Sequence, residues 1–163
     1  MNATEFDSLQ RACDTLIQGQ QSLLLATSST AGDADIGYAP FVYADFCFYI
    51  FVSTLARHTQ NLLSNPKAAV LLIEPEAEAS NPFARQRLTF DCRVEEIAKS
   101  DSLHDLQLQA MTTKFGETMT LLRSLPDFHL MRLTPHCGRF VAGFGKAFAV
   151  DRNGHLQPSS RTG

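Results

Sequence analysis

The sequence predicts an α+β fold that is mainly β, in which six or seven antiparallel strands form a small closed or split barrel. Several short apolar runs follow one another with only tight turns between them, which is typical of an antiparallel meander. Residues 46–52, FCFYIFV, are rich in aromatic and β-branched side chains and suit a strand buried on both faces. Segments with helical spacing occur at the start, in the middle and late in the chain. A barrel buries such strands without leaving long free edges.

The N-terminal half is expected to form a helix, a three-stranded meander and a second helix. The expected elements are a helix at 4–19, strands at 22–27, 36–43 and 46–52, and a helix at about 56–64. The dipeptide Ala44-Asp45 is the expected hairpin turn, because only these two residues separate two apolar runs. Either Ser53 or Thr54 is expected to cap the second helix with its hydroxyl group.

The C-terminal half adds strands and a helical insertion. The expected elements are strands at 68–73 and 87–97, helices at 101–115 and 116–125, and strands at 128–133 and 139–150. Residues 74–86, rich in Glu, Pro and small side chains, predict an exposed loop and a candidate lid. The pattern further predicts a β-bulge near the end of the 87–97 strand, a turn at PHCG (135–138), and a last strand interrupted by Gly143 and Gly145.

Composition and charge narrow the function classes. With 163 residues, 44% of them apolar, the chain suits one domain, expected at 1–150, followed by a polar tail at 151–163. The formal net charge of −3, with both signs mixed along the chain, gives no basic surface for nucleic acid and no polybasic membrane patch. The acidic N-terminus does not resemble a signal peptide, so we expect a cytoplasmic protein with no membrane span.

The cysteines give no functional signal in the sequence. Cys13, Cys47, Cys92 and Cys137 are scattered and contain no CxxC pair. Two of them lie inside apolar, strand-like runs, where a free thiol packs as a small apolar side chain. We therefore expect reduced core residues rather than a disulfide framework or a metal cluster.

A junction between a strand and a helix is the first candidate site. Ser53 and Thr54 end the predicted strand at 46–52, and Arg57 and His58 open the helix after it. A helix N-terminus favours anions because its first amide groups are unpaired and its dipole is positive there. Hydroxyl groups and an arginine beside it would complete an anion site. The alternative is that the hydroxyl residues only cap the helix and that Arg57 and His58 form a solvated face.

Three segments resemble a known family. GRFVAGFGKAF at 138–148, TLARHTQNLLSNPKAAVLL at 54–72 and LPDFHL at 125–130 are similar to the HugZ/HutZ-type haem-utilisation proteins. That group belongs to the pyridoxamine 5′-phosphate oxidase-like, FMN-binding split-barrel superfamily. The resemblance covers nearly the whole chain, from the opening helix to Val150. It implies a homodimer of split barrels whose ligand sites lie at the dimer interface and are built from both subunits.

For an FMN-binding member, the resemblance implies a phosphate site at the strand-to-helix junction. The residues at the matching positions are Ser53, Thr54 and Arg57, with Arg87 or Gln86 as a further contact. Such a protein would be an FMN-dependent oxidoreductase.

For a haem-utilisation protein, the resemblance implies that haem is bound and opened oxidatively with release of iron, using electrons from a partner such as a reductase. A histidine near the carboxyl terminus would be the axial ligand, which points to His155. Asp127 would support the proximal side, and His58 would act in the site or be the iron ligand itself. Arg139 or Lys146 is a candidate partner for a haem propionate or an FMN phosphate by charge-assisted hydrogen bonding.

Other assignments remain open at the sequence level. The remaining histidines include His129, a candidate partner for Asp127, and His104 and His136, which are expected on the surface. Gly143 and Gly145 are expected to mark a bulge rather than a phosphate-binding loop. The leading hypothesis is a haem-degrading enzyme; the alternatives are an FMN-dependent oxidoreductase and a non-catalytic carrier of haem or flavin.

Overall fold

The computed structural model describes residues 2–157, which form one seven-stranded antiparallel sheet and four α-helices. The strand order is β3-β2-β1-β4-β5-β6-β7, and β3 also pairs with β6, so that the first six strands of this order close into a barrel. The strands are β1 (Ser22–Ser28), β2 (Ala34–Ala44), β3 (Cys47–Ser53), β4 (Lys67–Ile73), β5 (Arg87–Glu96), β6 (Phe128–Gly143) and β7 (Lys146–Val150). The helices are α1 (Ala3–Gly19), α2 (Arg57–Ser64), α3 (Ser102–Phe115) and α4 (Glu117–Arg123). The predicted barrel, its antiparallel pairing and its four helices are confirmed.

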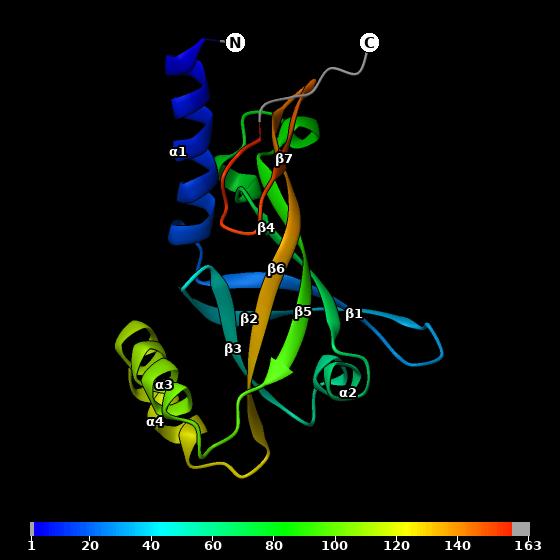
Figure 1. The fold of residues 1–163 in the computed structure, drawn as a ribbon, viewed down its shortest axis with the longest axis vertical. Coiled ribbons are helices and arrows are strands. Elements are labelled where there is room, and N and C mark those ends of the chain that lie inside the picture. The colour runs from blue at the N-terminus through cyan, green and yellow to red at the C-terminus, as the bar shows by residue number, and fades with distance from the viewer. Residues whose placement is uncertain (1, 158–163) are drawn as a thin grey trace.

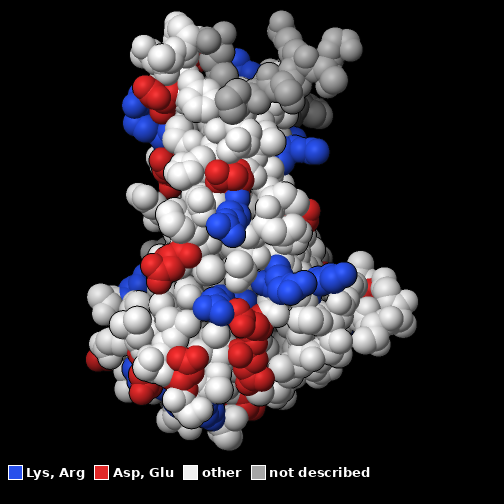
Figure 2. Space-filling view, in the orientation of Figure 1, with Lys and Arg blue, Asp and Glu red and all other residues white. Residues whose placement is uncertain are grey.

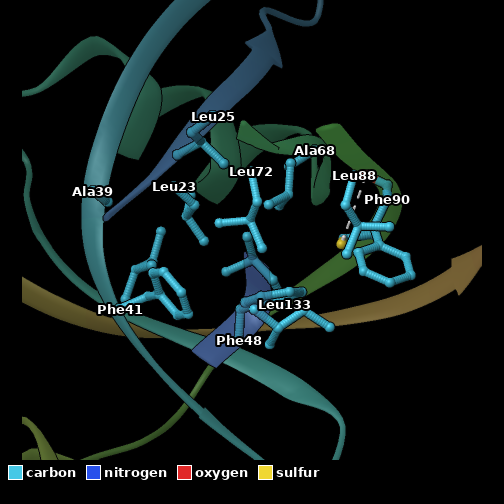
Figure 3. Packing of buried hydrophobic residues seen from close by; sticks show 14 of the residues in the cluster. Leu23, Leu25, Ala39, Phe41, Phe48, Ala68, Leu72, Leu88, Phe90 and Leu133 are labelled. Atoms are coloured by element: carbon cyan, nitrogen blue, oxygen red, sulfur yellow. Dashed lines mark hydrogen bonds between the residues drawn. The ribbon is translucent and has the colours of Figure 1, made fainter. Parts of the chain in front are cut away.

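The barrel interior holds the main core. Alternate side chains of the strands point inward, as the two-residue period of a β-strand requires. Figure 3 shows Leu23, Leu72 and Leu133, from three different strands, pointing toward one another across the interior. Aromatic rings fill the rest, and Phe48 packs edge-to-face against Phe41 with ring centroids 5.4 Å apart. This packing holds the strands that carry the candidate site in fixed register.

β3 is buried on both faces, as predicted from its aromatic sequence. Phe48 and Ile50 are fully buried inside the barrel. Tyr49 points to the other face, where it packs with Met111 of α3 and Met119 of α4 in a second apolar cluster. The α3–α4 pair therefore covers the outside of β2 and β3, as Figure 1 shows.

α1 and α2 lie at different ends of the molecule. α1 runs beside the upper part of the barrel in Figure 1 and contributes Cys13, Leu16 and Ile17 to the core. α2 lies across the opposite end, where it contacts β1 and β2. Its buried Asn61 donates a hydrogen bond to Thr27 of β1 at 3.0 Å. The position of α2 fixes the strand-to-helix junction that the sequence singles out.

The β2–β3 hairpin turn lies one residue later than predicted. Its central residues are Asp45 and Phe46, with φ values of 50° and 60°, rather than Ala44-Asp45. Positive φ at both positions matches a type I′ turn, which follows the twist of the flanking strands. Phe46 thereby leaves the strand and is half-exposed. The prediction placed Phe46 in the strand because its side chain is apolar. The backbone conformation of the turn, and not the side chain, determines its position.

The structure corrects the prediction at the end of the sheet. β6 runs without a break from Phe128 to Gly143, so PHCG at 135–138 is part of a strand and not a turn. The register between β5 and β6 shifts at Asp91/Cys92, which places the bulge there and not near the end of β5. Phe144 and Gly145 form the β6–β7 hairpin turn, and Gly143 and Gly145 have φ values of 141° and 68°. Glycine tolerates such φ values at no steric cost, so the predicted 139–150 strand is two strands.

Residues 151–157 fold back onto α1. Leu156 is buried in the core and forms a β-bridge with Val150. Gln10 of α1 donates its side-chain N–H to the Gly154 carbonyl and accepts the Leu156 N–H, at 2.9 and 2.8 Å. These bonds fix the conformation of the turn at 151–154. The tail expected at 151–163 extends further, to residues outside the described part of the chain.

Charges of both signs are interspersed on the face shown in Figure 2. Within the described residues, no helix is both long enough and apolar enough to cross a lipid bilayer. Cys13 and Cys92 are buried core residues as predicted, and burial raises the pKa of each thiol to about 12. The prediction is wrong for Cys137, which is exposed on the outer face of β6.

Candidate functional site

Ser53 and Asp127 join the ends of two neighbouring strands. The Ser53 hydroxyl, at the end of β3, donates a hydrogen bond to the carboxylate of Asp127, just before β6. The same hydroxyl accepts the Leu55 N–H at 3.1 Å, and the Thr54 N–H donates to the Asp127 carbonyl at 2.9 Å. Two predicted site residues, Ser53 and Asp127, therefore lie in direct contact.

Neither predicted hydroxyl residue caps α2. The N-cap is Ala56, which makes no side-chain cap hydrogen bond. The prediction that Ser53 or Thr54 caps α2 is wrong because two further residues separate Thr54 from the helix, and the Ser53 hydroxyl is engaged by Asp127. The N-terminus of α2 consequently keeps its favourable field for an anion without a capping side chain in the way.

Arg57 lies beside a carboxylate and is largely exposed. Its Nε atom is 3.9 Å from Oδ1 of Asp35 in β2. The side chain of Arg57 is 61% exposed whereas that of Asp35 is 19% exposed. An exposed ion pair of this length contributes little to stability, so the guanidinium group can turn toward another anion at small cost.

His58 packs on the backbone of β2. Its Nδ1 atom lies 3.0 Å from the point that a Cβ atom would occupy on Gly37, so a larger residue there would press on the ring. Partial burial lowers the pKa of His58, against a smaller opposing effect of the Asp35 carboxylate. The neutral imidazole is therefore favoured, and this is the form that binds a metal ion.

Arg87, Arg139 and Lys146 line one hollow of about 450 Å³. Arg139 is the cross-strand partner of Thr89, and Arg87 is paired with Val141, so the two arginines are diagonal neighbours of the β5–β6 ladder. Among the described residues, neither arginine has a carboxylate within ion-pair distance. Close like charges repel, which favours an anion in this basic hollow.

The hollow also has aromatic walls. Phe83 and Phe144 line it and are 85% and 70% exposed, respectively. Lys146 reaches the same hollow from β7, where it is the cross-strand partner of Gly143 of β6. Lys146 also lies near Glu5, with 3.6 Å between Nζ and Oε1.

Gln86 has only an indirect connection to the basic hollow. Its backbone N–H donates to the Glu74 carboxylate at 3.0 Å, and its carbonyl accepts the Glu74 N–H at 2.8 Å. These bonds hold the start of β5 where Arg87 enters the basic hollow. Gln86 is not among the residues that line that hollow.

His155 lies in the C-terminal turn. Its Nδ1 is 3.6 Å from the Asp151 carboxylate, and its side chain is 63% exposed. Figure 1 shows this turn beside α1, at the opposite end of the barrel from α2. His155 and His58, which opens α2, therefore lie at opposite ends of one subunit.

The predicted residues form two separate groups. Ser53, Arg57, His58 and Asp127 lie near the α2 end of the barrel, whereas the basic hollow lies near the β6–β7 turn at the other end. Arg57 does not line any of the three hollows whose lining is described.

The remaining histidines agree with expectation only in part. His129 does not pair with Asp127; its Nδ1 lies 2.6 Å from Oε1 of Glu96, a neighbour across the β5–β6 ladder. His104 is buried rather than exposed, since α3 turns this face toward the core. His136 is exposed, as expected, although it lies in a strand and not in a turn.

A larger hollow of about 810 Å³ lies elsewhere on the barrel and was not predicted from the sequence. Ala26 and Ala69 form part of its floor, and Lys67, Arg93 and Arg152 are the basic groups among its lining residues. Lys67 and Arg93 are cross-strand partners, an arrangement that only the register of β4 and β5 reveals. No local pattern in β4 or β5 marks this hollow, because residues of several strands and of the C-terminal turn line it together.

The closed six-stranded barrel with a strand-to-helix junction after β3 defines a split-barrel protein. The pyridoxamine 5′-phosphate oxidase family model matches residues 9–142, and the chain belongs to this family. Heme oxygenase HutZ of Vibrio cholerae is 40% identical over 133 residues, which are 82% of this chain and 76% of that protein.

Solved structures agree with this assignment. The crystal structure described as HutZ, the heme storage protein from Vibrio cholerae, superposes with a TM-score of 0.76 at 36% identity, covering 78% of this chain and 90% of that chain. Campylobacter jejuni ChuZ superposes with a TM-score of 0.83 at 27% identity, covering 93% of this chain and 62% of that chain. The predicted resemblance to the haem-utilisation branch of the family is confirmed.

Proposed function

We propose that two copies of this chain bind haem between them and open its ring oxidatively, releasing iron for use in the cytoplasm. The observation that carries the proposal is the 40% identity to a heme oxygenase across 82% of the chain. The geometry adds a basic, aromatic-walled hollow that suits an anionic, planar ligand.

The basic hollow fits the propionates of haem. Two carboxylate groups at one edge of a flat apolar ring match two arginines and a lysine beside two exposed phenyl rings. A guanidinium group binds a carboxylate through paired, charge-assisted hydrogen bonds. The volume of about 450 Å³ lies within the range of small-molecule sites, roughly 300–1,000 Å³. Arg87 and Arg139 would hold the propionates, with Lys146 at the rim.

The iron ligand is one of two histidines. His58 offers a neutral imidazole that packs on Gly37, and His155 offers an exposed ring beside Asp151. Since His58 lies at the opposite end of the barrel from the basic hollow, a haem in that hollow would take His58 only from a partner subunit. A homodimer is therefore part of the proposal.

Asp127 would act on the site through its neighbours. It is hydrogen-bonded to Ser53 at the end of β3. The short segment that follows Ser53 leads to Arg57 and His58 at the start of α2. A carboxylate that hydrogen-bonds an iron-bound imidazole fixes the orientation of the ring and raises its basicity. The haem iron supplies the oxygen chemistry, and a reductase supplies the electrons. The role of the chain is to bind, orient and shield the haem ring.

FMN is a second candidate ligand, because the family is that of pyridoxamine 5′-phosphate oxidase. The junction that would hold the phosphate is only partly suited to it. The α2 N-terminus is free of a side-chain cap, but Asp35 accompanies Arg57 and Asp127 occupies the Ser53 hydroxyl. Two carboxylates close to a dianionic phosphate oppose its binding. The residues fit FMN less well than haem.

A carrier role is the third candidate. The solved HutZ structure is described as that of a heme storage protein, whereas the same name is given elsewhere to a heme oxygenase. Storage and degradation share the binding site and differ in the fate of the bound haem once electrons are supplied.

One experiment separates these functions. The purified protein is loaded with hemin and given ascorbate in air, with an iron chelator present to report released iron. The enzyme proposal predicts loss of the haem absorption together with about one chelated iron per haem. Persistent haem absorption, with no chelated iron, would leave the carrier role, and a flavin spectrum of the protein as isolated would favour the FMN alternative.

A further inference from the structure

Three different metal-binding side chains meet on the outer face of the barrel. They are Asp91 of β5 and His136 and Cys137 of β6, whose ligand atoms all lie within 4.8 Å of one another. All three residues are exposed. None of them lines the hollow of Arg87, Arg139 and Lys146, although Cys137 lies only two residues before Arg139 in β6, and the proposed haem site does not use them.

A β-bulge brings these side chains to one face. Asp91 is paired with Cys137 and the next residue, Cys92, is paired with Pro135, so His136 is the extra residue of the ladder. In a regular strand, consecutive side chains point to opposite faces, but a bulge turns two consecutive side chains to the same face. The burial pattern agrees, because His136 and Cys137 are both exposed whereas Pro135 is buried.

The spacing of the cluster already suits a bound metal ion. The Cys137 Sγ atom lies 3.3 Å from Oδ2 of Asp91. Zinc binds thiolate sulfur at about 2.3 Å and carboxylate oxygen at about 2.0–2.2 Å in tetrahedral geometry, which separates the two ligand atoms by about 3.5 Å. The sulfur and the oxygen therefore need to move little on binding. The imidazole nitrogen of His136, which is exposed and within 4.8 Å of both atoms, has to come closer.

The donor set selects the kind of metal. One sulfur, one nitrogen and one oxygen ligand suit a borderline-soft divalent cation, and Zn²⁺ accepts all three types. We propose that Asp91, His136 and Cys137 form a binding site for Zn²⁺, with water as the fourth ligand. On binding, the Cys137 thiol loses its proton to solvent and the S–H···O contact with Asp91 is replaced by two metal bonds. The thiolate and the carboxylate then balance the charge of the ion.

The surroundings leave the fourth position accessible. Asp91 and His136 line the 810 Å³ hollow that Lys67, Arg93 and Arg152 also line. The positive charges of these three side chains weaken the electrostatic attraction of the site for Zn²⁺. They do not change the three ligands. They also favour a small anion in the hollow next to the metal ion.

The test uses haem-free protein and Co²⁺ as a spectroscopic substitute for Zn²⁺. A Co²⁺–thiolate bond gives a charge-transfer absorption that carboxylate and imidazole ligands do not give. We expect this absorption to saturate at one Co²⁺ per chain and to vanish when Zn²⁺ is added in excess. The variant Cys137→Ser should lack it, whereas the matched control Cys47→Ser should keep it, because Cys47 is the other described cysteine that is not buried.

A second measurement covers the remaining ligands. In a calorimetric titration with Zn²⁺, His136→Asn and Asp91→Asn should each weaken binding by more than the roughly 10- to 100-fold that loss of an outer-shell partner costs. The proposal is overturned if the Co²⁺ absorption survives Cys137→Ser, or if Zn²⁺ binding is unchanged in both His136→Asn and Asp91→Asn. Since haem is absent from these titrations, their outcome is independent of the haem proposal.

Discussion

The side chain of Ser53 donates a hydrogen bond to the carboxylate of Asp127, which ties the end of β3 to the start of β6. These two strands are the pair that closes the barrel. The contact therefore lies at the end of the ladder that closes the barrel and also involves the residue proposed to support the proximal side of the haem. Asp127 has a structural role in the protomer whether or not a ligand is bound.

The variant Ser53→Ala should lower the free energy of unfolding by about 1 kcal/mol, because the half-buried Asp127 carboxylate loses its side-chain donor. Thr54→Ala is the matched control, since no side-chain hydrogen bond of Thr54 accompanies its backbone bond to Asp127. Urea unfolding of both variants measures the difference. Equal stability of Ser53→Ala and Thr54→Ala would show that the contact contributes nothing.

The contact between His58 and Gly37 predicts coupling between the two positions. Gly37→Ala places a Cβ atom 3.0 Å from Nδ1 of His58 and should cost about 1 kcal/mol. In a His58→Ala background the same change should cost less by at least about 0.5 kcal/mol, because the ring is gone. A double-mutant cycle from urea unfolding gives this number. Strict additivity would mean that the ring does not pack on Gly37 in solution.

Stability should decrease as the pH falls, through the titration of His58. Burial lowers the pKa of the folded state below 6.5, so the unfolded chain binds a proton more readily. The contribution of neutral His58 to the free energy of unfolding is therefore fully present above pH 6.5. It is lost as the pH falls toward the lower pKa of His58 in the folded state. We expect His58→Gln to flatten the pH dependence of the urea midpoint between about pH 7 and pH 5. An unchanged slope in His58→Gln would contradict this assignment.

Gly138 of β6 is the cross-strand partner of Phe90 in β5, and the space there suits only glycine. A Cβ atom there would lie 2.5 Å from the ring of Phe90 and 2.8 Å from the Thr89 carbonyl oxygen. Gly138→Ala should therefore destabilise the protein by about 1–3 kcal/mol, because neither a core ring nor a ladder carbonyl can move freely. The control is Gly19→Ala, where no atom lies within 4 Å. Thermal unfolding of both variants compares the two sites, and equal melting temperatures would show that position 138 tolerates a side chain.

The basic hollow makes a prediction about ligand affinity. Arg139→Glu should weaken hemin binding at least about tenfold, the loss of one charge-assisted contact plus added repulsion. Arg11→Glu, an equal charge change at an exposed position of α1, should leave the affinity within about twofold. Equilibrium titration of each variant with hemin gives both constants. Equal affinities of the two variants would exclude Arg139 from the site.

The strands of this protein were predictable because their signals are local. The aromatic run of β3 indicated a strand buried on both faces, and the alternation in β5 indicated a half-buried strand. The errors in the strands arose where backbone geometry outweighs the side chain. Asp45 and Phe46 form the β2–β3 turn because of their positive φ values, and His136 lies in a bulge that the four letters PHCG do not distinguish from a turn.

The candidate site was predictable only in part. Arg87 and Arg139 share a hollow because of the β5–β6 register, which the sequence does not encode locally. The Ser53–Asp127 contact joins residues 74 positions apart and forms only once the barrel closes. The cluster of Asp91, His136 and Cys137 was missed for the same reason, since two strands and a bulge assemble it.

Titration of the purified, haem-free protein with hemin, monitored by absorption spectroscopy, tests the proposed haem binding most directly. We expect a sharp Soret band that saturates at a fixed ratio of haem to chain and shifts in His58→Ala or His155→Ala, whichever removes the iron ligand. A broad, unsaturable hemin spectrum, identical in the wild-type protein and in both variants, would contradict haem binding by this chain.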